Sequence, residues 1–269
     1  GFKDLWRFSS RYFCDSCLSW RKINTIMRDT YALTSFQKEL VELEIHLTEE
    51  QIGQFLTYYE LLTEWNSFMN LTAIIDFKEV LTKHFLDSLS IVNAQKMKKV
   101  RSLLDVGTGA GFPGIALKIA FPWLEITLLD SLNKRVTFLN KVIQSLKLEG
   151  IRALHGRAED YGQQPEYREK FELCVSRAVA HLSSLSEYCL PFVKLGGKFI
   201  SYKSGKIKIE ELVQAKKAVY LVGGNYEKLI CFSLPTTNDE RTFVVLIKQR
   251  FTPKKYPRKA GIPTKKPLS

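Results

Sequence analysis

The sequence has no apolar run of 18 or more residues, so it predicts no membrane-spanning helix. Charged residues such as Asp4 and Arg7 interrupt its beginning, which argues against a secretory signal. Five cysteines in 269 residues are few, and three of them, Cys174, Cys189 and Cys231, lie in apolar sequence. We expect these three to be buried thiols of a cytoplasmic protein, in a reducing compartment.

A metal site is not indicated either. Cys14 and Cys17 form a single CxxC, and the sequence has no second CxxC or HxxxH to complete a zinc site. A redox-active CxxC should lie beside a strand–helix unit, which this segment does not resemble. We therefore expect no metal and no activity in residues 1–33, which we interpret as an N-terminal extension outside the core.

Acidic residues are absent from residues 248–269, which contain eight basic ones. Residues 1–26 contribute +3 and residues 248–269 contribute +8 to the net charge of +12, so residues 27–247 carry only +1. The segment 251–269 also contains four prolines, which predicts a mobile basic tail that cannot pack as a helix. Such a tail is either solubilising or a contact for nucleic acid.

Residues 34–98 are predicted to form a helical region packed on the core. Apolar residues recur at helical spacing over 34–46 and 48–69, and Thr48 with Gln51 forms a potential capping box. Asp76 is placed to begin a third helix.

Residues 99–250 alternate between apolar runs and amphipathic segments, which predicts an α/β domain with a Rossmann-like, mostly parallel, doubly wound sheet. The last two apolar runs are close together and predict a C-terminal antiparallel hairpin. The expected strands are 102–107, 125–130, 151–156, 171–178, 196–203, 226–234 and 241–249.

The segment "LLDVGTGAGFPG", residues 103–114, places Gly107, Gly109 and Gly111 directly after the first strand. Ligands of doubly wound sheets bind at the carboxyl ends of the strands, and glycine lets a ligand approach the backbone there. Asp130 ends the second strand, where a carboxylate can accept hydrogen bonds from both ribose hydroxyls. The pattern predicts a nucleoside site.

Two kinds of nucleoside ligand fit these glycines. Residues 109–114 spell GxGxxG, which is typical of an oxidoreductase that binds a dinucleotide. However, the turn begins at Gly107, and Pro113 has no N–H to offer a pyrophosphate. These features favour S-adenosylmethionine, which has one adenosine, an amino acid tail and no phosphate.

Six motifs together resemble the RsmG (GidB) family of 16S ribosomal RNA guanine-N7 methyltransferases. They are "NLTAI" (70–74), "HFLDSL" (84–89), "DVGTGAGFPGI" (105–115), "LLDSLNKRVTFL" (128–139), "RAED" (157–160) and "SRAV" (176–179). The resemblance covers about residues 34–250. It implies a class I methyltransferase fold, S-adenosylmethionine as cofactor and 16S ribosomal RNA, free or in a small-subunit particle, as partner. We expect a monomer.

The resemblance also implies roles for individual residues. It implies that the cofactor lies among Gly107, Gly109, Gly111, Phe112, Asp130, Ala158, Glu159 and Arg177. Arg177 would face both cofactor and target and is the candidate catalytic residue. His84, Lys134, Arg135 and Lys203 would contact RNA, and Asp87 also matches a position near the catalytic face.

Attack by guanine N7 needs no general base, because N7 carries a lone pair and no proton. The sequence has no Pro-Cys pair for cytosine C5 methylation, and the segment after the fourth strand, "SRAVAHLSS", lacks the Asn/Asp-Pro-Pro-aromatic stretch common in amino methylation. A third possibility, beside methyltransferase and oxidoreductase, is a non-catalytic RNA-binding protein on a methyltransferase fold.

Overall fold

The computed structural model describes residues 20–177, 180–235 and 237–268, and Cys14 and Cys17 lie outside them. Within these residues the chain forms a seven-stranded sheet in the order β3-β2-β1-β4-β5-β7-β6. The strands are β1 (Ser102–Val106), β2 (Glu125–Asp130), β3 (Ile151–His155), β4 (Phe171–Ser176), β5 (Val193–Ser204), β6 (Gly224–Ser233) and β7 (Glu240–Lys248). Each corresponds to a predicted strand.

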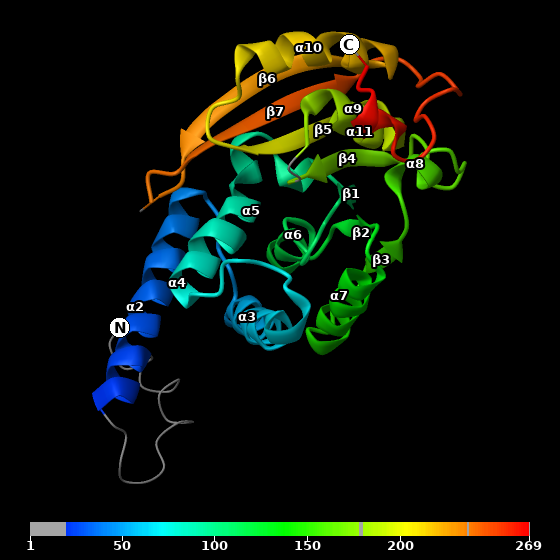
Figure 1. Ribbon diagram of the computed structural model, residues 1–269. Helices are drawn as coiled ribbons and strands as arrows, with labels where there is room; N and C mark the ends of the chain where they lie inside the picture. The colour runs from blue at the N-terminus through cyan, green and yellow to red at the C-terminus, as the bar shows by residue number, and fades with distance from the viewer. Residues whose placement is uncertain (1–19, 178–179, 236, 269) are drawn as a thin grey trace.

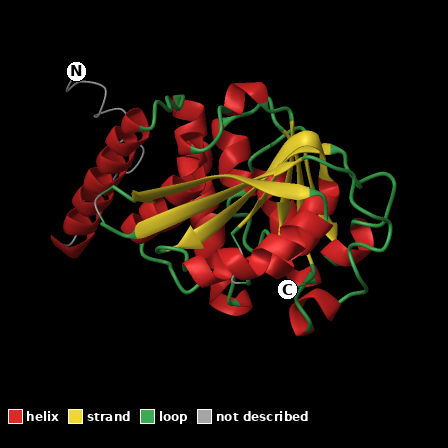
Figure 2. Ribbon diagram, turned by 90° about the horizontal axis from the view of Figure 1, so that it is seen from above, coloured by secondary structure: helices red, strands yellow, loops and turns green. Residues whose placement is uncertain are grey.

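The first five strands are parallel, and β7 runs antiparallel to both β5 and β6. The predicted fold class and the C-terminal antiparallel hairpin are therefore confirmed. In the parallel part, Asp105 pairs with Leu128 and Asp130 with His155, so the carboxyl ends of β1, β2 and β3 meet at one edge. Helices cover both faces of the twisted sheet (Figure 2).

Successive side chains of each strand point to opposite faces of the sheet, so the core consists of two clusters. Leu103 of β1 faces a cluster shared with α6 (Gly114–Ala120), α7 (Asn133–Ser145) and the N-terminal helices. The next residue, Leu104, faces a second cluster, shared with α9 (Leu182–Cys189) and α10 (Ile209–Leu221). Burial on both faces explains why these strands appear in the sequence as continuous apolar runs.

The N-terminal helices lie along one side of the domain (Figure 1). They are α2 (Trp20–Glu42), α3 (Glu49–Met69) and a further helical run made of α4 (Phe77–Val80), the π-helix η1 (Leu81–Leu86) and α5 (Asp87–Leu89). The 3₁₀ turns η2 (Ser90–Asn93) and η3 (Met97–Lys99) lead into β1. None of the helices within the described ranges is long and apolar enough to cross a membrane.

The helix starts are partly as predicted. The capping box of Thr48 and Gln51 is present, and Asp76 caps α4. The helix predicted over 34–46 instead begins at Trp20 and ends at Glu42. It crosses the boundary placed at residue 33, and Ala32 is buried in the core. Cys174 and Cys189 are buried as predicted, whereas Cys231 is exposed, on the edge strand β6.

The prediction of a mobile tail was wrong. Residues 251–268 fold back onto α8 (Ala158–Tyr161) and α9 and include a short helix, α11 (Ile262–Lys265), seen in red in Figure 1. Tyr256 and Pro263 are buried. Arg168 donates hydrogen bonds to the carbonyls of Thr252 and Tyr256 at 2.6 and 2.8 Å. Because prolines have no N–H, a chain rich in them can be held through its carbonyls instead.

Candidate active site

The turn after β1 requires its glycines. Gly107, Gly109 and Gly111 have φ angles of 71°, 62° and 98°, in the left-handed region that favours glycine. At Gly111 a Cβ would also lie 2.6 Å from side-chain atoms of Ile115 and Tyr58. Glycine is therefore needed at these positions for the backbone of the turn, and at Gly111 also for the close packing of Ile115 and Tyr58 against it.

A cavity of about 230 Å³ opens beside this turn, and we call it the glycine cavity. It lies at the carboxyl ends of β1, β2 and β4, as expected for a doubly wound sheet. Two predicted cofactor residues beyond the turn, Ala158 and Glu159, are part of its wall. The lining residues are Val106, Gly107, Leu129, Ser131, Gly156, Arg157, Ala158, Glu159, Ser176, Ala180, Leu185 and Tyr188.

Asp130 ends β2 with its side chain directed back at the glycine turn. Its Oδ2 accepts a hydrogen bond from Gly109 N, and its Oδ1 accepts one from Leu132 N, both at 2.9 Å. Asp130 is buried, and its two neighbours, Leu129 and Ser131, line the glycine cavity. Oδ2 also accepts a hydrogen bond from Arg135 Nη1 at 3.4 Å. The carboxylate thus holds the turn against β2, and one lone pair remains, on Oδ1.

Glu159 is buried at the start of α8, in the wall of the glycine cavity. Its Oε1 accepts a hydrogen bond from Gly261 N of the tail at 2.8 Å. The tail therefore orients a predicted cofactor residue. Composition alone gave no sign of this contact.

Asp105 is a potential functional residue that the sequence analysis did not single out, although its carboxylate is fully buried at the end of β1. Its Oδ2 accepts hydrogen bonds from Thr108 Oγ1 and Gly114 N, whereas Oδ1 has no partner among the described residues. Burial raises the pKa of Asp105 to about 6, and the hydrogen bonds from Thr108 and Gly114 oppose this shift. The sequence signal was that Asp105 is the one charged residue of β1.

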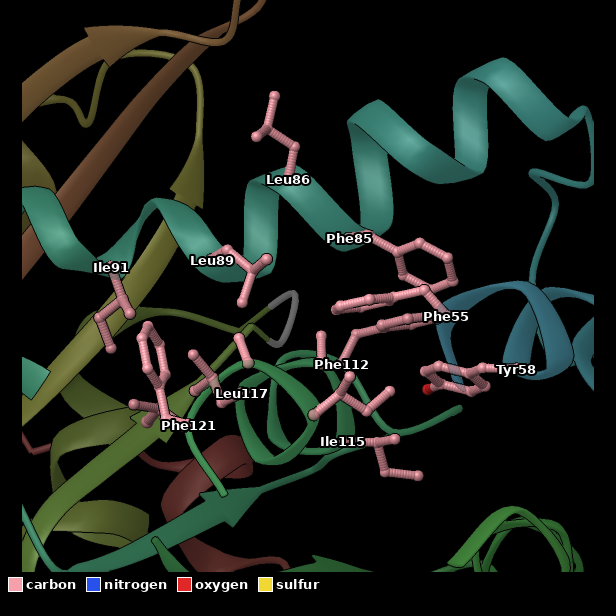
Figure 3. Packing of buried hydrophobic residues seen from close by; sticks show 14 of the residues in the cluster. Phe55, Tyr58, Phe85, Leu86, Leu89, Ile91, Phe112, Ile115, Leu117 and Phe121 are labelled. Carbon is pink, nitrogen blue, oxygen red and sulfur yellow. The ribbon is translucent and has the colours of Figure 1, made fainter. Parts of the chain in front are cut away.

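Phe112 does not line the glycine cavity. Its ring stacks between His84, at a centroid distance of 4.5 Å, and Tyr58, at 5.3 Å. Figure 3 shows Phe112 among Phe55, Tyr58 and Phe85, which come from α3 and η1. The aromatic side chain thus joins the glycine turn to the N-terminal helices.

Arg177 follows β4 and is held by the N-terminal helical run. Its Nη1 donates to Asp87 Oδ2 at 3.0 Å and to the Lys83 carbonyl at 3.2 Å. Its guanidinium also lies over the ring of Phe112, 5.1 Å from the centroid. Asp87 accepts a second charged hydrogen bond through Oδ1 from Arg241 Nε, also at 3.0 Å. One buried carboxylate thus joins two arginines.

His84 completes this network as a neutral ring. Arg177 Nη2 lies 3.3 Å from its Nδ1, and Thr72 Oγ1 lies 2.9 Å from its Nε2. Because arginine can only donate, Nδ1 accepts and Nε2 carries the proton. Burial, together with the charge of Arg177, lowers the pKa of His84 to about 3.

A second cavity, of about 330 Å³, adjoins the first, and we call it the cation cavity. It opens at the ends of β4 and β5 and at the start of α10, and Ala180 lines both cavities. Its lining residues are Arg177, Ala180, His181, Tyr202, Lys203, Ser204 and Glu211. A predicted catalytic residue and a predicted RNA contact therefore share one wall.

The other predicted RNA contacts lie elsewhere. His84 lies behind Arg177 and does not line the cavity. Lys134 and Arg135 are in the first turn of α7, where Arg135 Nη1 lies 3.4 Å from Asp130 Oδ2 and Lys134 donates to the Met69 carbonyl. The structure thus brings Lys203 and Arg177 together, whereas Lys134 and Arg135 are on α7 and line neither cavity.

The strand order, the antiparallel β7 between β5 and β6, and a glycine turn leading into a cavity define a class I methyltransferase fold. The chain belongs to the rRNA small subunit methyltransferase G (GidB) family, whose model matches residues 51–240.

Curated relatives agree with this assignment. The chain is 54% identical over 242 residues to a ribosomal RNA small subunit methyltransferase G of Lachnoclostridium phytofermentans, covering 90% of this chain and 98% of that protein. It is 52% identical to the protein of the same name from Alkaliphilus oremlandii, over 84% of this chain and 94% of the relative. The family resemblance stated from the motifs is confirmed.

Proposed function

We propose that this protein transfers a methyl group from S-adenosylmethionine to N7 of a guanine in 16S ribosomal RNA. The observation that carries the proposal is the meeting of the two cavities at Ala180. One cavity follows a glycine turn at the strand ends, and the other is lined by cations suited to a nucleic acid. The name shared by the relatives supplies the substrate class, ribosomal RNA of the small subunit.

The residues present fit S-adenosylmethionine. Asp105 Oδ1 is a buried acceptor without a partner in the described chain, which suits an ammonium group. Asp130 Oδ1 has one lone pair left for a ribose hydroxyl, and Ala158 and Glu159 line a wall against which an adenine can lie. We therefore assign Gly107, Asp130, Ala158 and Glu159 to cofactor binding, and Phe112 to holding the turn from beneath.

The bound cofactor would supply a methyl group on a positively charged sulfur. Guanine N7 would accept this methyl group with its own lone pair, and the electron pair of the carbon–sulfur bond would stay on sulfur. No proton moves, so the protein needs to supply only proximity and orientation. Asp87 holds Arg177 at the cavity wall and offsets its charge, which limits repulsion as positive charge moves onto the purine.

The test is methyl transfer from labelled S-adenosylmethionine to small-subunit RNA and to small-subunit particles from cells lacking the gene. We expect label at N7 of one guanine, identified by nucleoside mass spectrometry, and Arg177→Ala should remove it. Label on another atom or base would overturn the assignment. The two substrates would also decide whether the protein methylates free RNA or the particle.

Binding experiments separate the remaining alternatives. We expect calorimetry to detect S-adenosylhomocysteine and not nicotinamide dinucleotides, because the turn supplies no N–H at Pro113 for a pyrophosphate. Saturable S-adenosylhomocysteine binding without methyl transfer to any RNA would favour a non-catalytic RNA-binding role. We also propose that the protein acts in the cytoplasm as a monomer, which sedimentation at several concentrations tests.

A further inference from the structure

The cation cavity contains one acidic residue, Glu211, among its described lining residues. Glu211 lies in the first turn of α10, and its side chain is 23% exposed. Methyl transfer to N7 as described above gives this carboxylate no role, because no general base is required. A carboxylate in a cavity suited to a polyanion therefore needs a separate explanation.

Both hydrogen bonds accepted by the Glu211 carboxylate are made by the same oxygen. Oε1 accepts from Lys203 Nζ and from Leu182 N, both at 2.9 Å. In the described part of the chain, Oε2 receives no hydrogen bond. Partial burial opposes ionisation of the carboxyl group, but the hydrogen bonds from Lys203 and Leu182 outweigh it, and the pKa of Glu211 is lowered. The group is an ionised acceptor.

Lys203 supplies a donor directly beside this acceptor. Its Nζ donates to Glu211 Oε1 and to the Ala180 carbonyl, the latter at 2.7 Å. An ammonium group has three N–H bonds, so one donor remains for a ligand. The wall thus offers a donor at Lys203 next to an acceptor at Glu211 Oε2.

Guanine has the complementary order along its edge. Its O6 is an acceptor, and the adjacent N1–H is a donor. Adenine has the reverse order, with an amino donor at position 6 and an acceptor at N1. We propose that the Lys203–Glu211 pair recognises the target guanine through O6 and N1–H and rejects adenine. The inference rests on the proposed function, since it requires that the target base enters the cation cavity.

This orientation directs N7 towards the other cavity. In a purine, position 6 lies between N1 and N7 along the ring edge. Lys203, which would contact O6, also contacts the carbonyl of Ala180, the residue that lines both cavities. With N1–H at Glu211, N7 therefore lies on the side of Ala180 and the glycine cavity.

The pair also acts on the rate. As N7 gains the methyl group, the purine becomes cationic and its N1–H becomes a stronger donor. The hydrogen bond to the Glu211 carboxylate therefore strengthens between ground state and transition state, which is the condition for raising kcat rather than only lowering KM.

The test compares Glu211→Gln with wild type in methyl transfer to small-subunit RNA. The amide can still accept from Leu182 N and Lys203, but it places an N–H opposite guanine N1–H. We expect kcat to fall by about 10- to 100-fold, the scale of one charged hydrogen bond, with KM for RNA changed less. Binding of S-adenosylhomocysteine should be unchanged. Glu210→Gln, on the same helical turn but exposed and outside both cavities, is the matched control.

The outcomes separate the pair from the proposed function. If wild type methylates guanine N7 and Glu211→Gln has a kcat within twofold of it, the pair is not the recognition element although the function stands. If wild type modifies another atom, the proposed function itself fails.

A second measurement avoids mutation. In saturation-transfer NMR with S-adenosylhomocysteine present, guanosine monophosphate should contact the unaltered protein. Adenosine monophosphate and N1-methylguanosine monophosphate should not. Equal signals from all three would overturn the proposal.

Discussion

Two segments outside the strands reach the site from opposite faces of the sheet. They differ in how well their structure could be predicted from sequence. Residues 34–98 pack in the cluster that contains Phe85, and they hold Arg177 through Asp87 and His84. The tail, residues 251–268, packs in the cluster that contains Tyr256, and it holds Glu159 and α9. The first segment contained a recognisable motif, whereas the second appeared to be only a charged end.

The difference arises because a net charge taken from the sequence does not show which basic residues are paired with acids or buried in the folded protein. Of the eight basic residues from 248 onward, Lys248 is buried beside Glu169, at 3.2 Å, and Arg258 is paired with Glu187. Burial lowers the pKa of Lys248 to about 8, although Glu169 opposes the shift. Arg250 lies over the ring of Tyr220. Part of the basic character of residues 248–269 is therefore structural rather than available to a polyanion.

The largest effect is expected when the contact between the tail and Glu187 of α9 is removed. Arg258 Nε and Nη2 donate to both oxygens of Glu187, whose side chain is fully buried. Arg258→Ala should lower the free energy of unfolding by about 3 kcal/mol, because it removes the cation and leaves the buried carboxylate only the backbone N–H of residue 258. It should also weaken S-adenosylhomocysteine binding, since the tail holds Glu159 and contacts Tyr188 through Thr264.

Urea denaturation and calorimetry measure these two changes. Arg258→Lys should recover part of both, because it restores the charge but not the two-pronged geometry. Lys259→Ala, at the exposed neighbouring position, is the control. A less stable Arg258→Ala protein with unaltered cofactor affinity would show that the tail stabilises the fold without shaping the glycine cavity.

The next largest effect is expected when the ion pairs of Asp87, on the N-terminal segment, are removed. Asp87→Ala leaves the guanidinium groups of Arg177 and Arg241 close together without their shared anion. We expect the free energy of unfolding to fall by about 2 kcal/mol, less than for Arg258→Ala because both arginines remain partly exposed and hydrated.

Methyl transfer by Asp87→Ala should be lost almost completely, while S-adenosylhomocysteine binding remains. Glu79→Ala, which removes an exposed ion pair with Lys83 in the same helical run, should hardly change the free energy of unfolding. Retained methyl transfer by Asp87→Ala would mean that Arg177 does not depend on the N-terminal segment for its position.

Sequence predicted those parts of the molecule that depend on local pattern. The strands, the capping box at Thr48 and the glycine turn follow from apolar runs, hydrogen bonding within one turn and backbone freedom. The N-terminal helical run was recognised through the motif that contains His84 and Asp87. These features need few residues to specify them, so one sequence is enough.

Contacts between distant segments were not predictable in this way. Arg241 reaches Asp87 across 154 positions and Gly261 reaches Glu159 across 102, and no spacing rule connects such residues. Phe112 was expected beside the cofactor from resemblance, but its direction depends on rings supplied by α3 and η1. The packing of the tail depends on acceptors and acids in α8 and α9 that a count of prolines and lysines does not include.

A smaller effect is expected in the pH dependence of stability. It distinguishes the two segments, because His84 is on the N-terminal segment and the tail has no histidine. The pKa of His84 is about 3 in the folded protein and near 6.5 in the unfolded chain, so the unfolded state binds more protons in this interval. Stability should therefore fall as the pH falls below about 6.5, by up to about 1.4 kcal/mol per unit.

Asp105 acts in the opposite direction. Its folded pKa of about 6 exceeds its ordinary value of 3.8, so this group adds stability as the pH falls through that interval. The diagnostic quantity is therefore the difference between wild type and His84→Gln in urea denaturation from pH 7 to 4. The variant should lose less stability in acid, and parallel curves would show that His84 has the same pKa in the folded protein as in the unfolded chain.

The smallest effect is expected from the exposed lysines of the tail. Lys254, Lys255, Lys259, Lys265 and Lys266 are exposed, unlike Lys248 and Arg258. Replacing all five by Ala should leave stability and cofactor affinity nearly unchanged, because the side chains are exposed and the contact of Lys255, over the ring of Tyr256, is with its own neighbour. If they contact phosphates, the dependence of log K for RNA on log salt should become shallower, by at most about 3.5 for five contacts to single-stranded RNA. Filter binding at several salt concentrations measures both slopes. Parallel slopes would mean that the tail serves the glycine cavity alone and that RNA is held by the cation cavity and the surface around it.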